Sequence, residues 1–497
     1  MLKQLTEKIK QKPNIGWGIF FAVMAAVFIL GILAASIAER RAEKIALINN
    51  RKVEITGIES RNEIWSENFP REYNTWKKTL NMDFRSKHLG NTLEDALEHR
   101  PKMVVLWAGY LFAQDYKTPR GHMYAVEDVR TSLRTGTPDE NIKDIQTASC
   151  WTCKSPDVPR MMHEIGIENF YKTPWSNLGN QIVNPIGCAD CHDPKTMDLT
   201  ITRPALIEAF ERQGRNIADA TPQELRSLVC AQCHVEYYFK GGGDKYVTFP
   251  WDNGTTVEDM EKYYDKTDFK DWTHAISRAP MIKAQHPDYE LFLFGPHAQR
   301  GLSCADCHMP YTSEGGIKYS NHQVTSPLKD IPNTCQVCHR DSEEQLRNYV
   351  YQNQDKALEI RDRVETELVK AHIMAKAAWD KGASETEMAP VMKLLRQAQW
   401  RWDYVAASHG GSFHAPVETQ RILAHSIDKS LLAQLELQKI LFARGITNVA
   451  MPDISTKEKA QAYIGLDIKS ISDKKANWVK TVVPKWVQTA KEKERLK

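Results

Sequence analysis

Residues 150–154 read Cys-Trp-Thr-Cys-Lys, the first of five C-x-x-C pairs that together contain every cysteine of the chain. The other four pairs are each followed at once by histidine, at 188–192, 230–234, 304–308 and 335–339. C-x-x-C-H is the attachment motif of c-type haem, in which two thiols bond to the porphyrin and the histidine binds the iron. The series predicts four such haems. The first pair keeps both thiols and their spacing, so it predicts a haem with lysine as the iron ligand.

The predicted haem attachments use all ten cysteines. The thiols form the pairs Cys150/Cys153, Cys188/Cys191, Cys230/Cys233, Cys304/Cys307 and Cys335/Cys338. The adjacent iron ligands are Lys154, His192, His234, His308 and His339.

Other uses of paired cysteines explain the series less well. Zinc needs two pairs, or one pair with two histidines at finger spacing, whereas here the number of pairs is odd and the gaps are irregular. A thioredoxin-like redox pair would not recur five times, and disulfides would not explain the repeated histidine. One alternative stays open for the pair at 150–154, namely a site that lost its haem when lysine replaced histidine.

The N-terminus has the layout of an export signal. Lysines at positions 3, 8, 10 and 12 stand against one acid, Glu7, and an uncharged apolar run over 15–35 follows. Small residues at 36–38 offer a cleavage site, but the run is also near the roughly 20 residues that span a bilayer. The sequence therefore predicts a signal peptide or an N-terminal membrane anchor over 1–38, with the haem-bearing part in the periplasm.

Charge and length set limits on the remaining residues. The segment 1–38 carries a surplus of three positive charges, equal to the net charge of +3 for the whole chain, so the rest is neutral. No basic stripe with interleaved aromatic residues predicts nucleic-acid binding. The haem motifs spread over 150–339, and adjacent haems would join this stretch and supply apolar interior. We expect 39–497 to form one pentahaem catalytic domain, mainly α-helical, with long loops around five c-type haems.

Long helices are expected near the C-terminus. The segment 342–381 is charged, lacks Pro and Gly, and has apolar residues near helical spacing. Forty residues of helix are roughly 60 Å long, so we expect this helix to make a coiled-coil-like homodimer contact. Two further helices are expected at about 386–407 and 416–444, with Gly410-Gly411 between them. The dimerising helices would thus occupy about 342–444.

The lysine-ligated haem is the natural place for catalysis. An iron with two histidine ligands is coordinatively full and suits electron transfer, whereas a catalytic iron needs an open position. Four bis-histidine haems need eight histidines, and the chain has 16.

This combination resembles the pentahaem cytochrome c nitrite reductases, periplasmic enzymes that form ammonium and carry one C-x-x-C-K site for the catalytic haem. The resemblance covers about residues 60–450. It also rests on Arg-Gly-His at 120–122, Ser-Leu-Arg-Thr-Gly at 132–136, Val-Glu-Tyr-Tyr-Phe at 235–239, Lys-Ala-Gln-His at 283–286 and His-Ala-Pro at 414–416.

The resemblance implies a set of active-site residues. Lys154 would be the proximal ligand of the active haem, and the distal residues would be Arg134, Tyr237 and His286. The fixed positive charge of Arg134 would hold the oxygens of nitrite. His286 would hold or give protons near neutral pH, and Tyr237 would donate a hydrogen bond.

The resemblance also implies the remaining metal ligands. The distal iron ligands would be His122, His297, His322 and His414, with His409 open as an alternative to His414. Calcium beside the active haem would bind oxygens of four residues, namely Glu236, Tyr237, Lys283 and Gln285, a ligand chemistry that suits this ion. The other histidines, His274 and His372 among them, are expected to be structural.

The implied reaction is the six-electron, eight-proton reduction of nitrite to ammonium, with side activity on hydroxylamine and nitric oxide. Four bis-histidine haems would relay electrons from a membrane-bound multihaem quinol dehydrogenase or a periplasmic cytochrome. The alternative is a multihaem cytochrome that only carries electrons, with five six-coordinate irons. Enzymes that run nitrogen chemistry oxidatively carry more haem motifs than this chain has.

Overall fold

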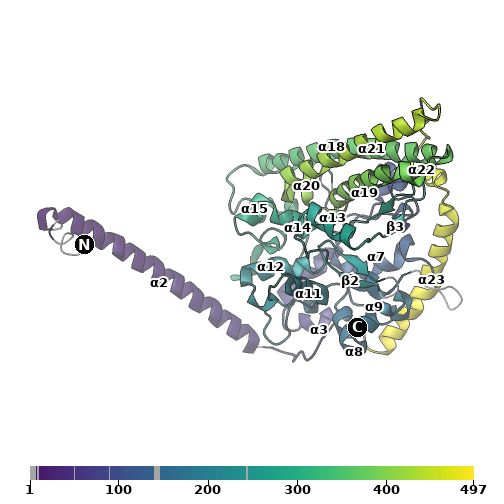
Figure 1. The fold of residues 1–497 in the computed structure, drawn as a ribbon. Coiled ribbons are helices and arrows are strands. Elements are labelled where there is room, and N and C mark those ends of the chain that lie inside the picture. Colours follow the sequence, from purple (N-terminus) through teal and green to yellow (C-terminus); the bar gives the residue numbers. More distant parts are fainter. Residues whose placement is uncertain are drawn as a thin grey trace. The chain divides into compact units, whose positions relative to one another are not determined.

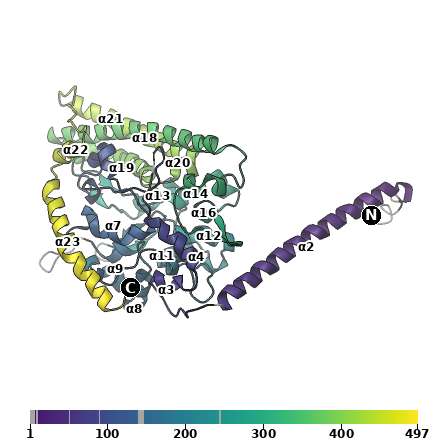
Figure 2. The same ribbon diagram turned by 180° about the vertical axis from the view of Figure 1, so that it is seen from behind.

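The computed structural model describes residues 7, 10–49, 51–88, 90–138, 146–241 and 245–496. The chain divides into two compact units, Met1–Ile55 and Thr56–Lys497 (Figures 1 and 2). Lysines 3 and 8 of the expected export signal lie outside the described residues.

The first unit contains one long helix, α2 (Pro13–Asn49). Its part Pro13–Ala42 is long and apolar enough to cross a membrane, with a mean hydropathy of 2.7 and none of that stretch buried. The helix continues without a break through residues 36–38, where the cleavage site is expected. Length and composition fit a signal peptide and an anchor equally, so the choice between them stays a prediction.

The second unit is built mainly from helices. Its α-helices are α3 (Asn62–Ser66), α4 (Pro70–Lys77), α5 (Ala96–His99), α6 (Lys102–Leu106), α7 (Ala125–Thr131), α8 (Asp157–Ile165), α9 (Ile167–Lys172), α10 (Cys188–Cys191), α11 (Pro204–Arg212), α12 (Pro222–Ala231), α13 (Val257–Lys266), α14 (Asp288–Leu293), α15 (Pro296–Gln299), α16 (Cys304–His308), α17 (Ile331–Thr334), α18 (Glu343–Asp380), α19 (Glu385–Ala407), α20 (Gly411–His414), α21 (Pro416–Phe442), α22 (Lys457–Tyr463) and α23 (Ile468–Glu492).

Short 3-10 helices and hairpins complete this unit. The 3-10 helices are η1 (Lys78–Leu80), η2 (Leu111–Ala113), η3 (His122–Tyr124), η4 (Leu133–Thr135), η5 (Ala148–Trp151), η6 (Trp175–Leu178), η7 (Ile217–Asp219) and η8 (Pro327–Lys329). The antiparallel strand pairs are β1–β2 (Tyr238–Lys240 with Tyr246–Thr248), β3–β4 (Trp272–Thr273 with Pro280–Met281) and β5–β6 (Tyr311–Glu314 with Ile317–Ser320). The prediction of a mainly α-helical fold with long C-terminal helices is confirmed.

The helices α18, α19 and α21 pack along one another, and both views show them together (Figures 1 and 2). Local sequence sets where they begin. The Ser342 side chain accepts a hydrogen bond from the Gln345 N–H at the start of α18, and Ser384 forms a capping box with Glu387 at the start of α19. Pro416 occupies the first turn of α21, where its missing N–H costs nothing.

Bulky aromatic residues form much of the interior. Trp400 and Trp402 of α19 are fully buried, and Trp402 lies 5.5 Å from Trp107, ring centroid to ring centroid. The stacked pair His274 and His372 is also fully buried, with ring centroids 4.0 Å apart. His372 Nε2 lies 2.8 Å from the Gln399 amide oxygen. Both histidines thus join α18 and α19 to the core, which fits a structural role.

Candidate active site

Each cysteine pair lies on a single turn of helix or at a helix end. The N–H of the following histidine closes this turn in the bonds from His192 to the Cys188 carbonyl at 3.0 Å and from His234 to the Cys230 carbonyl at 2.8 Å, whereas the Lys154 N–H donates to the Trp151 carbonyl at 2.9 Å. Positions i, i+3 and i+4 of a helix share one face. The turn therefore presents two thiols and the iron ligand to the same side, as covalent haem attachment requires. None of the ten cysteines, all of which lie among the described residues, forms a disulfide.

Six of the eight histidines expected to bind iron face each other in three pairs across the fold. The ring centroids are 6.2 Å apart for His192 and His322, 6.2 Å for His308 and His414, and 6.3 Å for His297 and His339. These contacts are long-range in the sequence, since His414 follows His308 by more than a hundred positions. The tertiary fold therefore brings the rings together.

This spacing suits one metal ion between two imidazoles. A histidine nitrogen lies about 2 Å from a bound first-row metal, and a ring centroid lies about 1.1 Å from its own nitrogen at standard bond lengths. Two rings that share one ion should then have centroids about 6.2 Å apart. The donor set therefore fits bis-histidine haem iron. His409, the alternative to His414, lies instead against His286, with ring centroids 5.1 Å apart.

Backbone carbonyls orient several of these rings. The Nδ1 atoms of His192 and His308 lie 3.0 Å from the carbonyl oxygens of Met197 and Thr325. A carbonyl only accepts, so each Nδ1 donates and each Nε2 keeps a free electron pair for a metal. A cavity of about 200 Å³ opens beside Cys307 and His308.

The two remaining expected ligands, His234 and His122, are not in ring contact. The His234 ring lies against His286 instead, with centroids 4.4 Å apart, and the ligand atoms of His234, His286 and Asp288 all lie within 4.8 Å of one another. Burial is the main reason that the pKa of His234 lies well below its usual value. The positive charges of His286 and His122 lower this pKa further.

The residues expected in the active site converge on the first cysteine pair. Burial raises the pKa of Tyr237 well above its usual value, the Cys153 and Cys150 thiols raise it further, and Arg134 opposes them. The phenol therefore lies within electrostatic reach of both thiols and of the arginine. The charges of Lys154 and His286 also act on Cys153. The fold thus gathers residues from four separate segments around the turn that carries Lys154.

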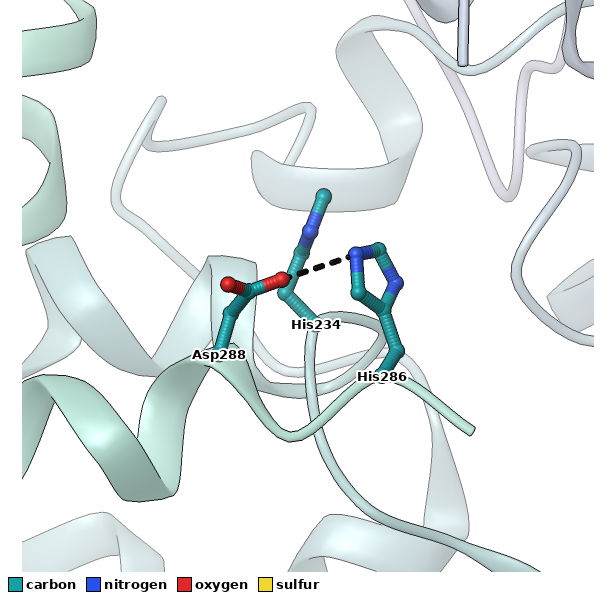
Figure 3. A group of neighbouring side chains, drawn as sticks. All are labelled: His234, His286 and Asp288. Atoms are coloured by element: carbon teal, nitrogen blue, oxygen red, sulfur yellow. Dashed lines mark ion pairs between the residues drawn. The ribbon is translucent and has the colours of Figure 1, made fainter. Parts of the chain in front are cut away.

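An aspartate that the sequence pattern did not reveal supports His286. His286 Nε2 lies 2.9 Å from Asp288 Oδ2 (Figure 3). Asp288 also accepts hydrogen bonds from the Ser408 hydroxyl and the Gly410 N–H, both at 2.9 Å. Burial would raise the pKa of Asp288, but the contact with His286 and its charge hold it well below its usual value. The only sequence signal is the short spacing of His286-Pro-Asp288.

Arg134 lines a cavity of about 160 Å³ together with residues of α23, a helix that the sequence analysis did not predict. The guanidinium of Arg134 lies 4.8 Å from the centre of the Phe112 ring. From α23, Lys475 donates to the Thr135 hydroxyl at 2.9 Å and to the Gly136 carbonyl at 2.6 Å. Burial lowers the pKa of Lys475 to about 7. A second basic residue therefore contacts the short turn that carries Arg134.

The expected calcium ligands lie within a cluster of buried carboxylates. Glu236 is fully buried, and its Oε2 accepts the Gln285 N–H at 2.6 Å. Burial raises the pKa of Glu236 well above its usual value and that of Glu290 to about 8. Glu290 Oε2 is buried without a hydrogen-bond partner. Lys283 is the adjacent cation, but its amine pairs with Asp403 at 2.7 Å. This surplus of buried negative charge fits a divalent cation with oxygen ligands.

Neighbouring cysteine side chains give an order to the cysteine pairs. Cys153 lies beside Cys233, and Cys304 lies beside Cys230. The charges of Cys335 and Cys338 act on Cys307, and that of Cys191 acts on Cys230. The first, third, fourth and fifth pairs therefore follow one another in space, and the second pair lies beside the third.

Comparison with known proteins is consistent with this site. The family model described as cytochrome c552 matches residues 61–494. Cytochrome c-552 from Bacteroides fragilis is 62% identical over 488 residues, covering 98% of this chain and 99% of that protein. The homologue from Parabacteroides distasonis is 61% identical with the same coverage. Among solved structures, cytochrome c nitrite reductase from Desulfovibrio desulfuricans, described with two calcium sites in its catalytic subunit, matches with a TM-score of 0.74 and 32% identity over 84% of this chain and 91% of that chain.

Proposed function

Because the chain belongs to the cytochrome c552 family, we propose that it is a cytochrome c nitrite reductase that converts nitrite to ammonium in the periplasm. The observation that carries this proposal is the convergence of Arg134, Tyr237 and His286 on the turn that presents Lys154. The likeness to the Desulfovibrio enzyme supports the same activity. Six electrons and eight protons would be used for each nitrite.

Five c-type haems would be held by the five cysteine pairs. One of them would have Lys154 as its proximal ligand and an open distal position, where it supplies the electrons that reduce nitrite. The other four would be ligated by His192, His234, His308 and His339, with His122, His297, His322 and His414 on their distal sides. The three ring pairs near 6.2 Å support six of these eight histidine assignments.

The protein side chains would bind the anion and supply protons. Arg134 would hold the nitrite oxygens with a fixed charge and directed N–H groups, a task that a planar guanidinium performs well. His286, kept in orientation by Asp288 at 2.9 Å, would pass protons to the departing oxygens. Burial keeps Tyr237 protonated, so its hydroxyl would act as a hydrogen-bond donor.

The order of the thiol contacts supports an electron path toward Lys154. Electrons would reach the first pair through the third, because Cys233 contacts Cys153. The fourth and fifth pairs extend the same series, and the second pair lies beside its middle. A six-electron reaction needs such a store, since the electrons must arrive before bound intermediates escape.

Calcium would occupy the buried carboxylate cluster. Its ligands would be the Glu236 carboxylate, the carbonyl oxygens of Tyr237 and Lys283, and the Gln285 amide. Since Tyr237 is itself an active-site residue and Gln285 directly precedes His286, the ion would join the Tyr237 and His286 segments. It would also offset the negative charge of Glu236 and Glu290, whose pKa values burial raises.

A homodimer would use the long helices. The side of α21 opposite its buried face carries exposed apolar residues, among them Leu432, Leu435 and Phe442. The donor would be a membrane-bound multihaem quinol dehydrogenase or a periplasmic cytochrome. Hydroxylamine and nitric oxide would be side substrates.

The test is a Lys154→His variant assayed for ammonium formation with nitrite and a reduced viologen. We expect the variant to keep five haems and lose most of the activity, because histidine would make the first site resemble the other four. Unchanged ammonium formation would refute the special role of Lys154. An oxidised wild-type protein with only low-spin EPR signals would instead favour the alternative, an electron carrier with no open iron.

A further inference from the structure

Two hydrogen bonds from Arg203 fix the backbone on both sides of Lys154. Arg203 is 1% exposed and immediately precedes α11. Its Nε donates to the Thr152 carbonyl at 2.6 Å, and its Nη2 donates to the Ser155 carbonyl at 3.0 Å. Cys153 and Lys154 are the two residues enclosed by these carbonyls. A rigid guanidinium fork therefore holds the turn that presents the lysine.

The same guanidinium reaches the second cysteine pair. Its Nη2 lies 2.5 Å from Asp190 Oδ1, and the other carboxylate oxygen of Asp190 accepts the Gly187 N–H at 2.9 Å. Asp190 is 3% exposed, so the ion pair is shielded from solvent. Removal of one partner from such a pair leaves an uncompensated buried charge.

The third cysteine pair joins the junction through Gln232. The amide oxygen of Gln232 accepts the Arg203 N–H at 3.2 Å, and its NH₂ group donates to the Asp190 carbonyl at 2.8 Å. Gln232 is 3% exposed. Thr152, Asp190 and Gln232 all stand immediately before the second cysteine of their pairs. These variable positions of the motif therefore connect the first three attachment turns.

The fourth pair offers a natural comparison, because residues 304–308 repeat the sequence of 188–192. Its aspartate, Asp306, pairs with Arg226 at 2.8 Å, and the two side chains are 30% and 20% exposed. Arg226 reaches no carbonyl of the Lys154 turn, since its side-chain bonds go to Ser303 and Asp306. The same motif thus makes a buried junction at one place and a solvent-accessible pair at the other.

We propose that Arg203 is a positioning residue for the lysine-ligated iron site, and that with Asp190 and Gln232 it sets the spacing of the first three haems. This inference rests on the proposed role of Lys154. Arginine is required because its planar fork serves two carbonyls and a carboxylate at once, which a lysine ammonium on a flexible stem does not reproduce.

The experiment compares holoprotein variants Arg203→Gln and Arg203→Lys with the matched control Arg226→Gln. Intact-mass measurement counts the attached haems, EPR of the oxidised protein reports the high-spin and low-spin irons separately, and nitrite kinetics give kcat and KM. For Arg203→Gln we expect five haems, an altered high-spin signal, unchanged low-spin signals and a kcat at least tenfold lower. Arg203→Lys should show nearly the same altered high-spin signal and lowered kcat as Arg203→Gln. Arg226→Gln should match the wild type in both.

Wild-type high-spin signals and a kcat within twofold in Arg203→Gln would overturn the proposal, as would an equal effect of Arg226→Gln. If the Arg203→Gln protein accumulates with fewer than five haems, peptide mass mapping identifies the cysteine pairs that lack haem. Loss confined to the first three pairs supports the junction, and loss from the fourth or fifth pair contradicts it. Absence of ammonium formation by the wild type would refute the proposed function, while the EPR comparison would still test the junction.

Discussion

At the scale of single residues, the charge of Arg134 should distinguish an anionic substrate from a neutral one. Replacement by glutamine removes the fixed positive charge and leaves a side chain that still fits beside Phe112. We expect kcat/KM for nitrite to fall about 100-fold, the typical cost of one oxyanion-stabilising group, and kcat/KM for neutral hydroxylamine to fall much less. Steady-state assays of both substrates with a reduced viologen measure this.

A matched control is Arg215→Gln, since Arg215 also lies over a phenylalanine ring, at 4.2 Å from the centroid of Phe210, but away from the first cysteine pair. It should leave both substrates unaffected. Equal losses for nitrite and hydroxylamine in Arg134→Gln would show that the arginine acts on protein structure and not on substrate charge.

Glu236→Gln should weaken the predicted calcium site. The variant keeps the shape of the side chain but removes a negative charge, and a hard divalent cation binds carboxylate oxygens preferentially. We expect less than one calcium per chain by plasma mass spectrometry and at least a tenfold loss of nitrite reduction, restored in part by millimolar calcium. Glu258→Gln, at a half-buried surface pair with Arg421, is the control. A fully active wild type that holds no calcium would contradict the site.

Residue types and spacing predict the haem attachments, and the resemblance to nitrite reductases predicts the active-site residues, but neither predicts the partners of these side chains. The preference for His414 over His409 depends on which ring meets His308, and a loop between two helices decides this. Asp288 and Arg203 escaped notice for a related reason. The residues that Asp288 and Arg203 contact lie far from them in the sequence. Acidic and basic residues are also usually solvent-exposed, so neither position stood out.

At the scale of elements, the three long C-terminal helices could be predicted to within about two residues at most ends. The capping serines of α18 and α19, the initial proline of α21 and the apolar periodicity act locally, so the sequence displays them. The helix α23 has only three buried residues, Lys475, Trp478 and Ala490, and was not predicted. Its contact with the Arg134 turn arises from tertiary structure alone.

Leu435→Glu tests whether α21 makes the homodimer contact. Leu435 is 53% exposed on the same side as Leu432 and Phe442, and burial of a charge there without a partner would oppose association. We expect the variant to elute as a monomer in size-exclusion chromatography with light scattering, with its five haems retained. Ile317→Glu, an exposed apolar position on the β5–β6 hairpin, should leave the dimer intact. A dimeric Leu435→Glu protein would place the interface elsewhere.

At the scale of the whole molecule, the N-terminal segment should determine where haem attachment takes place. A chain lacking residues 1–38 should stay in the cytoplasm and carry no covalent haem, whereas the full chain should carry five. Haem staining of gels and intact-mass measurement compare the two. A foreign cleavable signal peptide in place of residues 1–38 should restore all five haems if the segment acts only in export. Five haems on the truncated chain would refute the export role.

The pairing His308–His414 has a consequence for the order in which the molecule matures. A chain exported from its N-terminus presents all five cysteine pairs before residue 414 emerges. A haem attached at Cys304/Cys307 would therefore wait with one axial side unfilled until the last third of α18–α21 arrives. During that interval the future electron carrier would be as open to small ligands as the catalytic centre. Completion of the C-terminal helices would thus close this one site, which must not react, while the proposed catalytic centre would stay open.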